Sequence, residues 1–162
     1  IPCIYYGSEV NFATGLKEHE GNRNYFGQER VNNARQHVIH KNLTAIANIR
    51  KNSIALQKGL QVNLHLAGNT ASFYRIYQYE GVNQTALVLL NKGDAATSIT
   101  VDKMLTAGQW RDAASGEVIR VKNKQRHIAL DVPANGVRVL LLDAPVTHPA
   151  LLDEIQRVMA LR

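Results

Sequence analysis

The chain has 162 residues, a length that suits one ordinary domain or one domain with a short addition. Hydrophobic residues make up 45% of it and charged residues 20%, which excludes a disordered, collagen-like or coiled-coil rod protein. Cys3 is the single cysteine, so no disulfide within the chain can staple it, and no apolar run approaches the ~20 residues of a membrane-spanning helix. The net charge of +6 requires a nucleic-acid partner to be considered.

The first 32 residues combine a short apolar segment with a long polar one. Residues 1–6 predict a buried strand that ends at Gly7, and they begin without a methionine or a signal-like leader. We therefore expect the chain to be the C-terminal piece of a longer protein. Residues 8–32 have no usable periodicity and predict a loop, and loops of this length are usually functional or disordered.

Residues 33–51 predict a helix. Ile39, Leu43 and Ile46 repeat at helical spacing, and an asparagine at the start of the segment can cap it. Gly59 then marks the end of the helical pattern, and a strand-like pattern follows it.

Residues 59–143 predict an antiparallel β-sandwich of seven or eight short strands. Residues 60–66 alternate strictly between apolar and polar side chains, as a half-buried strand does. Turn sequences separate the other predicted strands, which are residues 71–80, 85–91, 97–102, 108–112, 117–122, 127–132 and 137–143.

The last predicted element is a helix over residues 148–161. Pro149 fits its first position, and Asp153 and Glu154 lie in its early turns. Because one side of this helix is apolar, it must pack either on the sandwich or on a neighbouring chain.

Several polar groups favour ordinary structural roles. Four basic residues alternate near the predicted strand over residues 117–122: Arg120, Lys122, Lys124 and Arg126. Such residues commonly protect a solvated sheet edge, and without interleaved aromatics they do not predict a nucleic-acid partner. His37 and His40 are three residues apart, but no nearby carboxylate or cysteine completes a metal site, so we expect none.

The predicted loop over residues 7–30 contains the residue types most typical of a ligand-binding site. Carboxylates, guanidinium groups and aromatic rings are what a carbohydrate site uses for hydroxyl pairs and for sugar C–H faces. An ordinary polar loop has a similar composition, so composition leaves both interpretations open. The residues concerned are Glu9, Glu18, His19, Glu20, Arg23, Tyr25, Phe26, Glu29 and Arg30.

Five segments, in order, resemble the alpha-amylase superfamily. Residues 1–9 (IPCIYYGSE) resemble its eighth barrel strand, Gly-x-Pro-x-x-Tyr-Tyr-Gly-x-Glu. Residues 49–59 (IRKNSIALQKG) are similar to the exit from its last barrel helix, Leu-Arg-Lys-x-x-Pro-Ala-Leu-x-x-Gly. The three segments that resemble the all-β domain following the barrel are residues 87–94 (LVLLNKGD), 110–116 (WRDAASG) and 132–137 (VPANGV).

The resemblance covers residues 1–143 and implies a mainly β protein. Its fold would be an antiparallel Greek-key β-sandwich, preceded by a remnant (strand, loop, helix) of a (β/α)8 barrel and followed by a short C-terminal helix. Residues 1–58 would be the barrel remnant, 59–143 the sandwich domain, and 144–162 a linker and terminal helix. A lone barrel strand has unpaired edges, so self-association through residues 1–32 or through the terminal helix is an expectation.

The resemblance also implies a parent enzyme that hydrolyses or transglycosylates α-1,4-glucans such as starch and maltodextrin. Retaining glycosidases need two carboxylates about 5 Å apart, and in this family these and a third essential aspartate lie on strands four, five and seven. All three would precede Ile1, so we expect no catalytic residue here and no activity from the chain alone. Cofactors are not expected in this chain, although calcium is possible in the preceding region, and the family favours an extracellular or periplasmic location.

Substrate contacts are implied for His19 and Arg23. Residues 19–23 (HEGNR) can be laid on the family's Asp-Pro-x-Asn-Arg, with His19 and Glu20 in place of Asp and Pro. Arg23 would reach a distal glucose, and the replacement puts the contact of the missing Asp in doubt. Glu9 lies in the first motif and is expected to anchor the loop rather than to touch sugar.

The alternative function is a non-catalytic β-sandwich module that binds carbohydrate or protein. It would need exposed aromatic residues on one face of the sandwich. Strand alternation places Phe73, Tyr77 and Tyr79 on one side and Tyr74 on the other. We expect most of these rings, and Trp110, to lie in the core.

Overall fold

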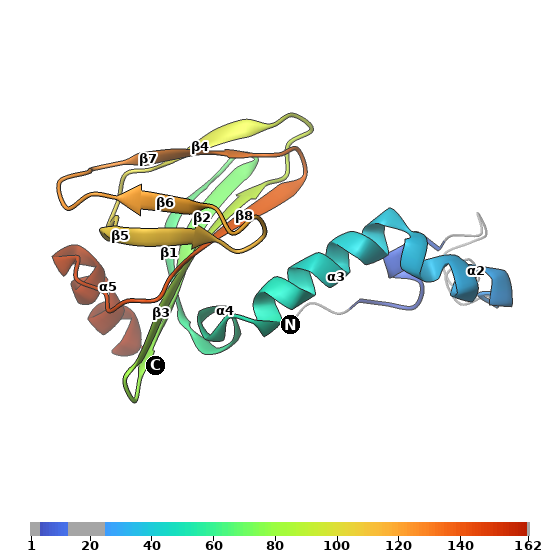
Figure 1. Ribbon diagram of the computed structural model, residues 1–162, viewed down its shortest axis with the longest axis horizontal. Helices are drawn as coiled ribbons and strands as arrows, with labels where there is room; N and C mark the ends of the chain where they lie inside the picture. The colour runs from blue at the N-terminus through green and yellow to red at the C-terminus, as the bar shows by residue number, and fades with distance from the viewer. Residues whose placement is uncertain (1–3, 13–24, 162) are drawn as a thin grey trace. The chain divides into compact units, whose positions relative to one another are not determined.

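The computed structural model describes residues 4–12 and 25–161 (Figure 1). The chain forms two compact units, Ile1–Asn48 and Ile49–Arg162. The first is helical in its described part, and the second contains all the strands that the structure describes.

The predicted first strand is not formed in its described part. Residues 1–3 lie outside the described residues, residues 4–6 have no strand pairing, and a 3-10 turn, η1 (Ser8–Val10), follows. A strand needs a neighbouring strand to pair with, and the described strands pair only with one another. The prediction of a strand is therefore wrong for these three residues.

The predicted helix over residues 33–51 is divided at His37. A short helix α2 (Gln28–Asn33) and a 3-10 turn η2 (Ala34–Gln36) precede the main helix α3 (Val38–Lys51), where a loop and an unbroken helix were expected. His37 has extended backbone angles, and its Nδ1 accepts a hydrogen bond from the Ile39 N–H at 3.3 Å. Its imidazole therefore caps α3. The residues usually predicted to cap the start of a helix are Ser, Thr, Asp and Asn.

A further short helix, α4 (Ile54–Lys58), joins α3 to the first strand and was not predicted. Ser53 Oγ caps it by accepting from the Leu56 N–H at 3.2 Å. Gly59 ends it at a point of close approach, where an added Cβ would lie 2.8 Å from the Ile76 nitrogen. The last position of the 49–59 motif therefore requires glycine because helix and sheet backbones meet there.

Within residues 4–12 and 25–161, eight strands form two antiparallel sheets. The larger sheet has the order β1-β2-β3-β8-β5-β6, and β4 pairs with β7 in the smaller one. The strands are β1 (Leu60–Ala67), β2 (Thr70–Tyr79), β3 (Val82–Asn91), β4 (Thr97–Val101), β5 (Gly108–Asp112), β6 (Val118–Val121), β7 (Ile128–Val132) and β8 (Gly136–Leu142).

The six-stranded sheet is the middle layer of the second unit. On β3, Leu87 and Leu89 enter a core shared with β4, β7 and the terminal helix, whereas Ala86 and Val88 pack with α4 on the opposite face. Strands covered on both faces read as continuous apolar runs, which explains residues 86–89 (ALVL). Trp110 and Tyr74 stack in the core shared with β4, β7 and the terminal helix, with ring centroids 6.0 Å apart.

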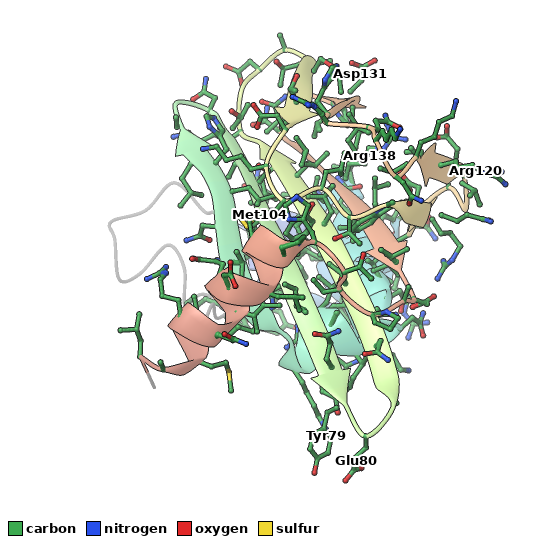
Figure 2. The ribbon with its side chains drawn as sticks, turned by 90° about the vertical axis from the view of Figure 1, so that its left-hand side faces the viewer. Tyr79, Glu80, Met104, Arg120, Asp131 and Arg138 are labelled. Atoms are coloured by element: carbon green, nitrogen blue, oxygen red, sulfur yellow. The ribbon has the colours of Figure 1, made fainter. Side chains whose placement is uncertain are left out.

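The terminal helix α5 (Pro149–Met159) packs on the sandwich (Figures 1 and 2). Leu151 is fully buried in the core, and Ile155 packs against the same cluster. The helix therefore covers one face of the sheet near β1, and self-association through it stays a prediction. None of the described helices is both long and apolar enough to cross a lipid bilayer.

A buried carboxylate closes the turn between β5 and β6. Asp112 accepts hydrogen bonds from the N–H groups of Ala114 and Ser115 at 2.9 and 3.0 Å. It also forms an ion pair with Arg138, whose Nε lies 2.8 Å from the carboxylate. Burial by itself raises the pKa of Asp112, but the hydrogen bonds from Ser115, Arg138 and Ala114 outweigh it and hold the pKa below its ordinary value.

This arrangement predicts a loss of stability in acid. Because the pKa of Asp112 is lower in the folded state, its contribution is present above the unfolded-state pKa and disappears as pH falls through the folded-state pKa. Urea unfolding between roughly pH 5 and 2 should therefore show a shallower fall in unfolding free energy for Asp112→Asn than for the native chain. Asp131→Asn, on an exposed position of β7, is the control for the change in charge; equal slopes for native and Asp112→Asn would contradict the prediction.

Candidate functional site

The predicted substrate-binding residues His19 and Arg23 lie in residues 13–24, outside the described residues. The structure describes the two segments that flank them, residues 4–12 and 25–33. Both segments lie within the first unit.

Three aromatic rings bring the two flanks of the loop together. The Phe12 and Phe26 centroids are 5.1 Å apart, and the Tyr6 ring lies 5.8 Å from each of them in edge-on geometry. Arg30 reaches back from α2, with its guanidinium carbon 5.1 Å from the Phe12 centroid and Nη1 donating to the Phe26 carbonyl at 3.3 Å. Together these contacts hold the described segments 4–12 and 25–33 against each other.

Gly7 makes this closure possible. Its φ of 75° is in the left-handed region, and its carbonyl accepts from the N–H groups of Val10 and Phe12 at 3.1 and 3.0 Å. A Cβ at this position would also collide with Phe12. The glycine in the Tyr-Tyr-Gly segment thus turns the chain so that Phe12 meets Tyr6.

A pocket opens beside this cluster within the first unit. Its volume is about 490 Å³, within the range of small-molecule sites. Its lining includes Tyr5, Tyr6 and Glu9 on one side and His40 and Thr44 of α3 on the other. Glu9 makes no hydrogen bond or ion pair with the described residues, so its expected role as a loop anchor stays a prediction.

The pocket offers one carboxylate, whereas a retaining glycosidase requires two at about 5 Å. Glu9 is the only Asp or Glu in the pocket lining, and no other described carboxylate lines it. The described lining of this pocket therefore supplies one carboxylate, that of Glu9.

The aromatic residues of the sandwich are divided between core and surface. Tyr74 and Trp110 are fully buried, and Phe73 and Tyr77 are half-buried on the opposite face of the sheet. The expected alternation along β2 is confirmed, as is the expectation that most of these rings belong to the core. Tyr79 is the exception, because 61% of its surface is exposed.

Histidines and basic residues gather no second site in the described part of the chain. No group of three His, Cys, Asp or Glu side chains within residues 4–12 and 25–161 could hold a metal ion. The four basic residues near residue 120 are exposed on and after β6, the last strand of the large sheet, as expected for a solvated edge.

Comparison with known proteins relates the fold to carbohydrate enzymes. No protein-family model matches the chain, and no curated protein matches it. An Anoxybacillus alpha-amylase is 20% identical with a TM-score of 0.62, over 88% of this chain and 29% of that one. An alpha-amylase from Geobacillus thermoleovorans, complexed with acarbose, is 19% identical with a TM-score of 0.66, over 86% of this chain and 29% of that one.

A third solved structure is described as a cyclomaltodextrin glucanotransferase with a three-domain arrangement. It is 22% identical with a TM-score of 0.59, over 88% of this chain and 29% of that one. The chain has the fold of part of an alpha-amylase. It spans less than a third of the length of each of these three chains. The predicted fold class, a mainly β sandwich with helical segments before and after it, is confirmed.

Proposed function

We propose that this chain is the C-terminal part of an alpha-amylase-type retaining enzyme that hydrolyses or transglycosylates α-1,4-glucans. The observation that carries the proposal is the fold match, which covers 86–88% of this chain but 29% of two alpha-amylases and a cyclomaltodextrin glucanotransferase. The order of the five sequence segments supports the same assignment independently of the fold.

In this proposal, the nucleophile and the acid/base carboxylate come from the part of the enzyme that precedes residue 1. A barrel enzyme places its chemistry on the loops at the C-terminal ends of the strands. Residues 7–30 would be the last of these loops. The contacts among Tyr6, Phe12 and Phe26, which join the two described ends of this segment, support the proposal.

The loop would contribute substrate contacts rather than chemistry. The guanidinium group of Arg23 has a planar fork of donors that matches a pair of sugar hydroxyls. His19 would donate or accept one hydrogen bond where the family has a carboxylate. Both contacts would bind ground state and transition state alike, so their removal should raise KM more than it lowers kcat.

The first test is the activity of the purified chain by itself. We expect no release of reducing ends from starch and no turnover of a chromogenic maltoside, because the two catalytic carboxylates are absent. The Glu9→Gln variant is the matched control, since Glu9 is the carboxylate in the pocket. Turnover that the native chain shows and Glu9→Gln loses would place catalysis within this chain and contradict the proposal.

A further inference from the structure

The β2–β3 hairpin extends beyond the sheet to which it belongs. Strand β1 pairs with β2 only as far as Ile76, and β8 pairs with β3 only from Thr85 onward. Residues 77–84 therefore form a two-stranded ribbon with both outer edges unpaired. Tyr77 and Gln84, at the base of this ribbon, still contact the body of the unit. Residues 78–82, at its tip, are exposed.

The tip of this ribbon exposes apolar side chains. Tyr79 and Val82 are cross-strand partners on one face, with 61% and 51% of their surfaces exposed. Figure 2 shows Tyr79 and Glu80 at the end of the hairpin, pointing away from the body of the unit. An aromatic ring in this position is accessible to a ligand from a wide range of directions.

The turn itself carries an unfavourable residue. Glu80 and Gly81 have φ values of 50° and 80°, a conformation in which hairpin turns strongly prefer Asn-Gly or Asp-Gly. Glu80 forms no hydrogen bond or ion pair with the described residues, whereas Asn83 Nδ2 donates to the Gly81 carbonyl at 3.2 Å. The strained turn thus holds a carboxylate without a partner next to the exposed ring of Tyr79.

We propose that this tip is a surface site for an α-glucan chain, separate from the loop over residues 7–30. Tyr79 would stack on the apolar C–H face of one sugar ring, while Glu80 accepts hydrogen bonds from its hydroxyl groups. The choice of α-glucan rests on the proposed function. A stable protein interface needs about 800 Å² from each partner. The four residues of the hairpin tip offer a smaller area, so a protein partner fits less well.

Affinity electrophoresis of the full chain tests this site. Native gels with and without soluble starch are run toward the cathode because the chain has a net charge of +6. We expect starch to retard the native chain and Tyr79→Phe, which keeps a ring, and to retard Tyr79→Ala and Glu80→Gln much less. Val118→Ala, which removes an equally exposed apolar side chain from β6, is the matched control and should behave like the native chain.

Each variant is compared with its own mobility in the starch-free gel, and far-UV circular dichroism checks that it is folded. If starch retards Tyr79→Ala as strongly as the native chain, binding lies elsewhere and the inference is wrong. It is equally wrong if starch does not retard the native chain. Neither result bears on the parent enzyme, whose activity is measured separately on the assembled catalytic centre.

Discussion

Replacing Trp110 with alanine is expected to lower the free energy of unfolding of the second unit by about 3–5 kcal/mol. The indole is fully buried, stacks on Tyr74 and donates from Nε1 to the Thr106 carbonyl at 2.9 Å. The substitution leaves a large cavity at the centre of the core, which the surrounding strands cannot fill because they are fixed by two sheets. Urea unfolding followed by far-UV circular dichroism measures the loss without relying on tryptophan fluorescence.

Two further variants separate the causes of this loss. Trp110→Phe keeps a stacked ring but leaves the Thr106 carbonyl without its buried donor, so a smaller loss of about 1–3 kcal/mol is expected. Val118→Ala, at an exposed position, should change stability by less than about 0.5 kcal/mol. If Trp110→Ala were no more destabilising than Val118→Ala, the core described for this unit would be wrong.

Asn91→Ala should destabilise the second unit by about 2–4 kcal/mol. The buried Val132 carbonyl loses its partner at a cost of about 1–3 kcal/mol, and the three other backbone groups, which are part-buried, add less each. Asn91 Nδ2 donates to the carbonyls of Ala95, Val132 and Pro133 at 2.9–3.3 Å, and its Oδ1 accepts from the Gly93 N–H at 2.9 Å. One buried amide thus links the end of β3 to the loops before β4 and β8.

The Asn91→Asp variant tests whether hydrogen bonding or volume causes this effect. A carboxylate has the same shape and still accepts from Gly93, but it donates nothing to the three carbonyls. We therefore expect Asn91→Asp to destabilise the unit as much as alanine does, whereas Asn63→Ala on the exposed side of β1 should be nearly neutral. Native-like stability of Asn91→Asp in urea unfolding would contradict the role assigned to the amide.

The strands were predictable because the pattern of the sequence reports burial directly. The run over residues 86–89 is apolar at every position, and this part of the strand is covered on both faces. Turn residues separate the strands, so their bounds followed from local chemistry. The terminal helix was predictable for the same reason, since its apolar stripe repeats at helical spacing and Leu151 on it is buried.

The short helices and the first strand were not predictable in this way. Helix α4 has only five residues and depends on one Ser53 cap and one close approach at Gly59, neither of which produces a periodic pattern. The division of the long helix depends on His37, whose imidazole is not a usual cap. A strand over residues 4–6 would need neighbouring strands, which are a property of the surrounding structure and not of these residues.

The candidate site was predictable in composition but not in geometry. Phe12 and Phe26 are fourteen positions apart with no repeat between them, so nothing in the pattern indicates that they touch. Their contact depends on the left-handed turn at Gly7. Alternation along β2 does not predict that Tyr79 is more exposed than the other aromatic residues of the strand. Its exposure arises because β1 pairs with β2 only as far as Ile76.

The most direct test of the proposed enzyme is reconstitution of activity. The polypeptide encoded immediately before residue 1 is produced separately, mixed with this chain and assayed on starch and a chromogenic maltoside. The account predicts that the two parts elute together from a sizing column and that hydrolysis or transglycosylation appears only in the mixture. Arg23→Ala should raise KM with little change in kcat. Co-elution without any activity on α-glucans, or no association at all, would contradict the assignment.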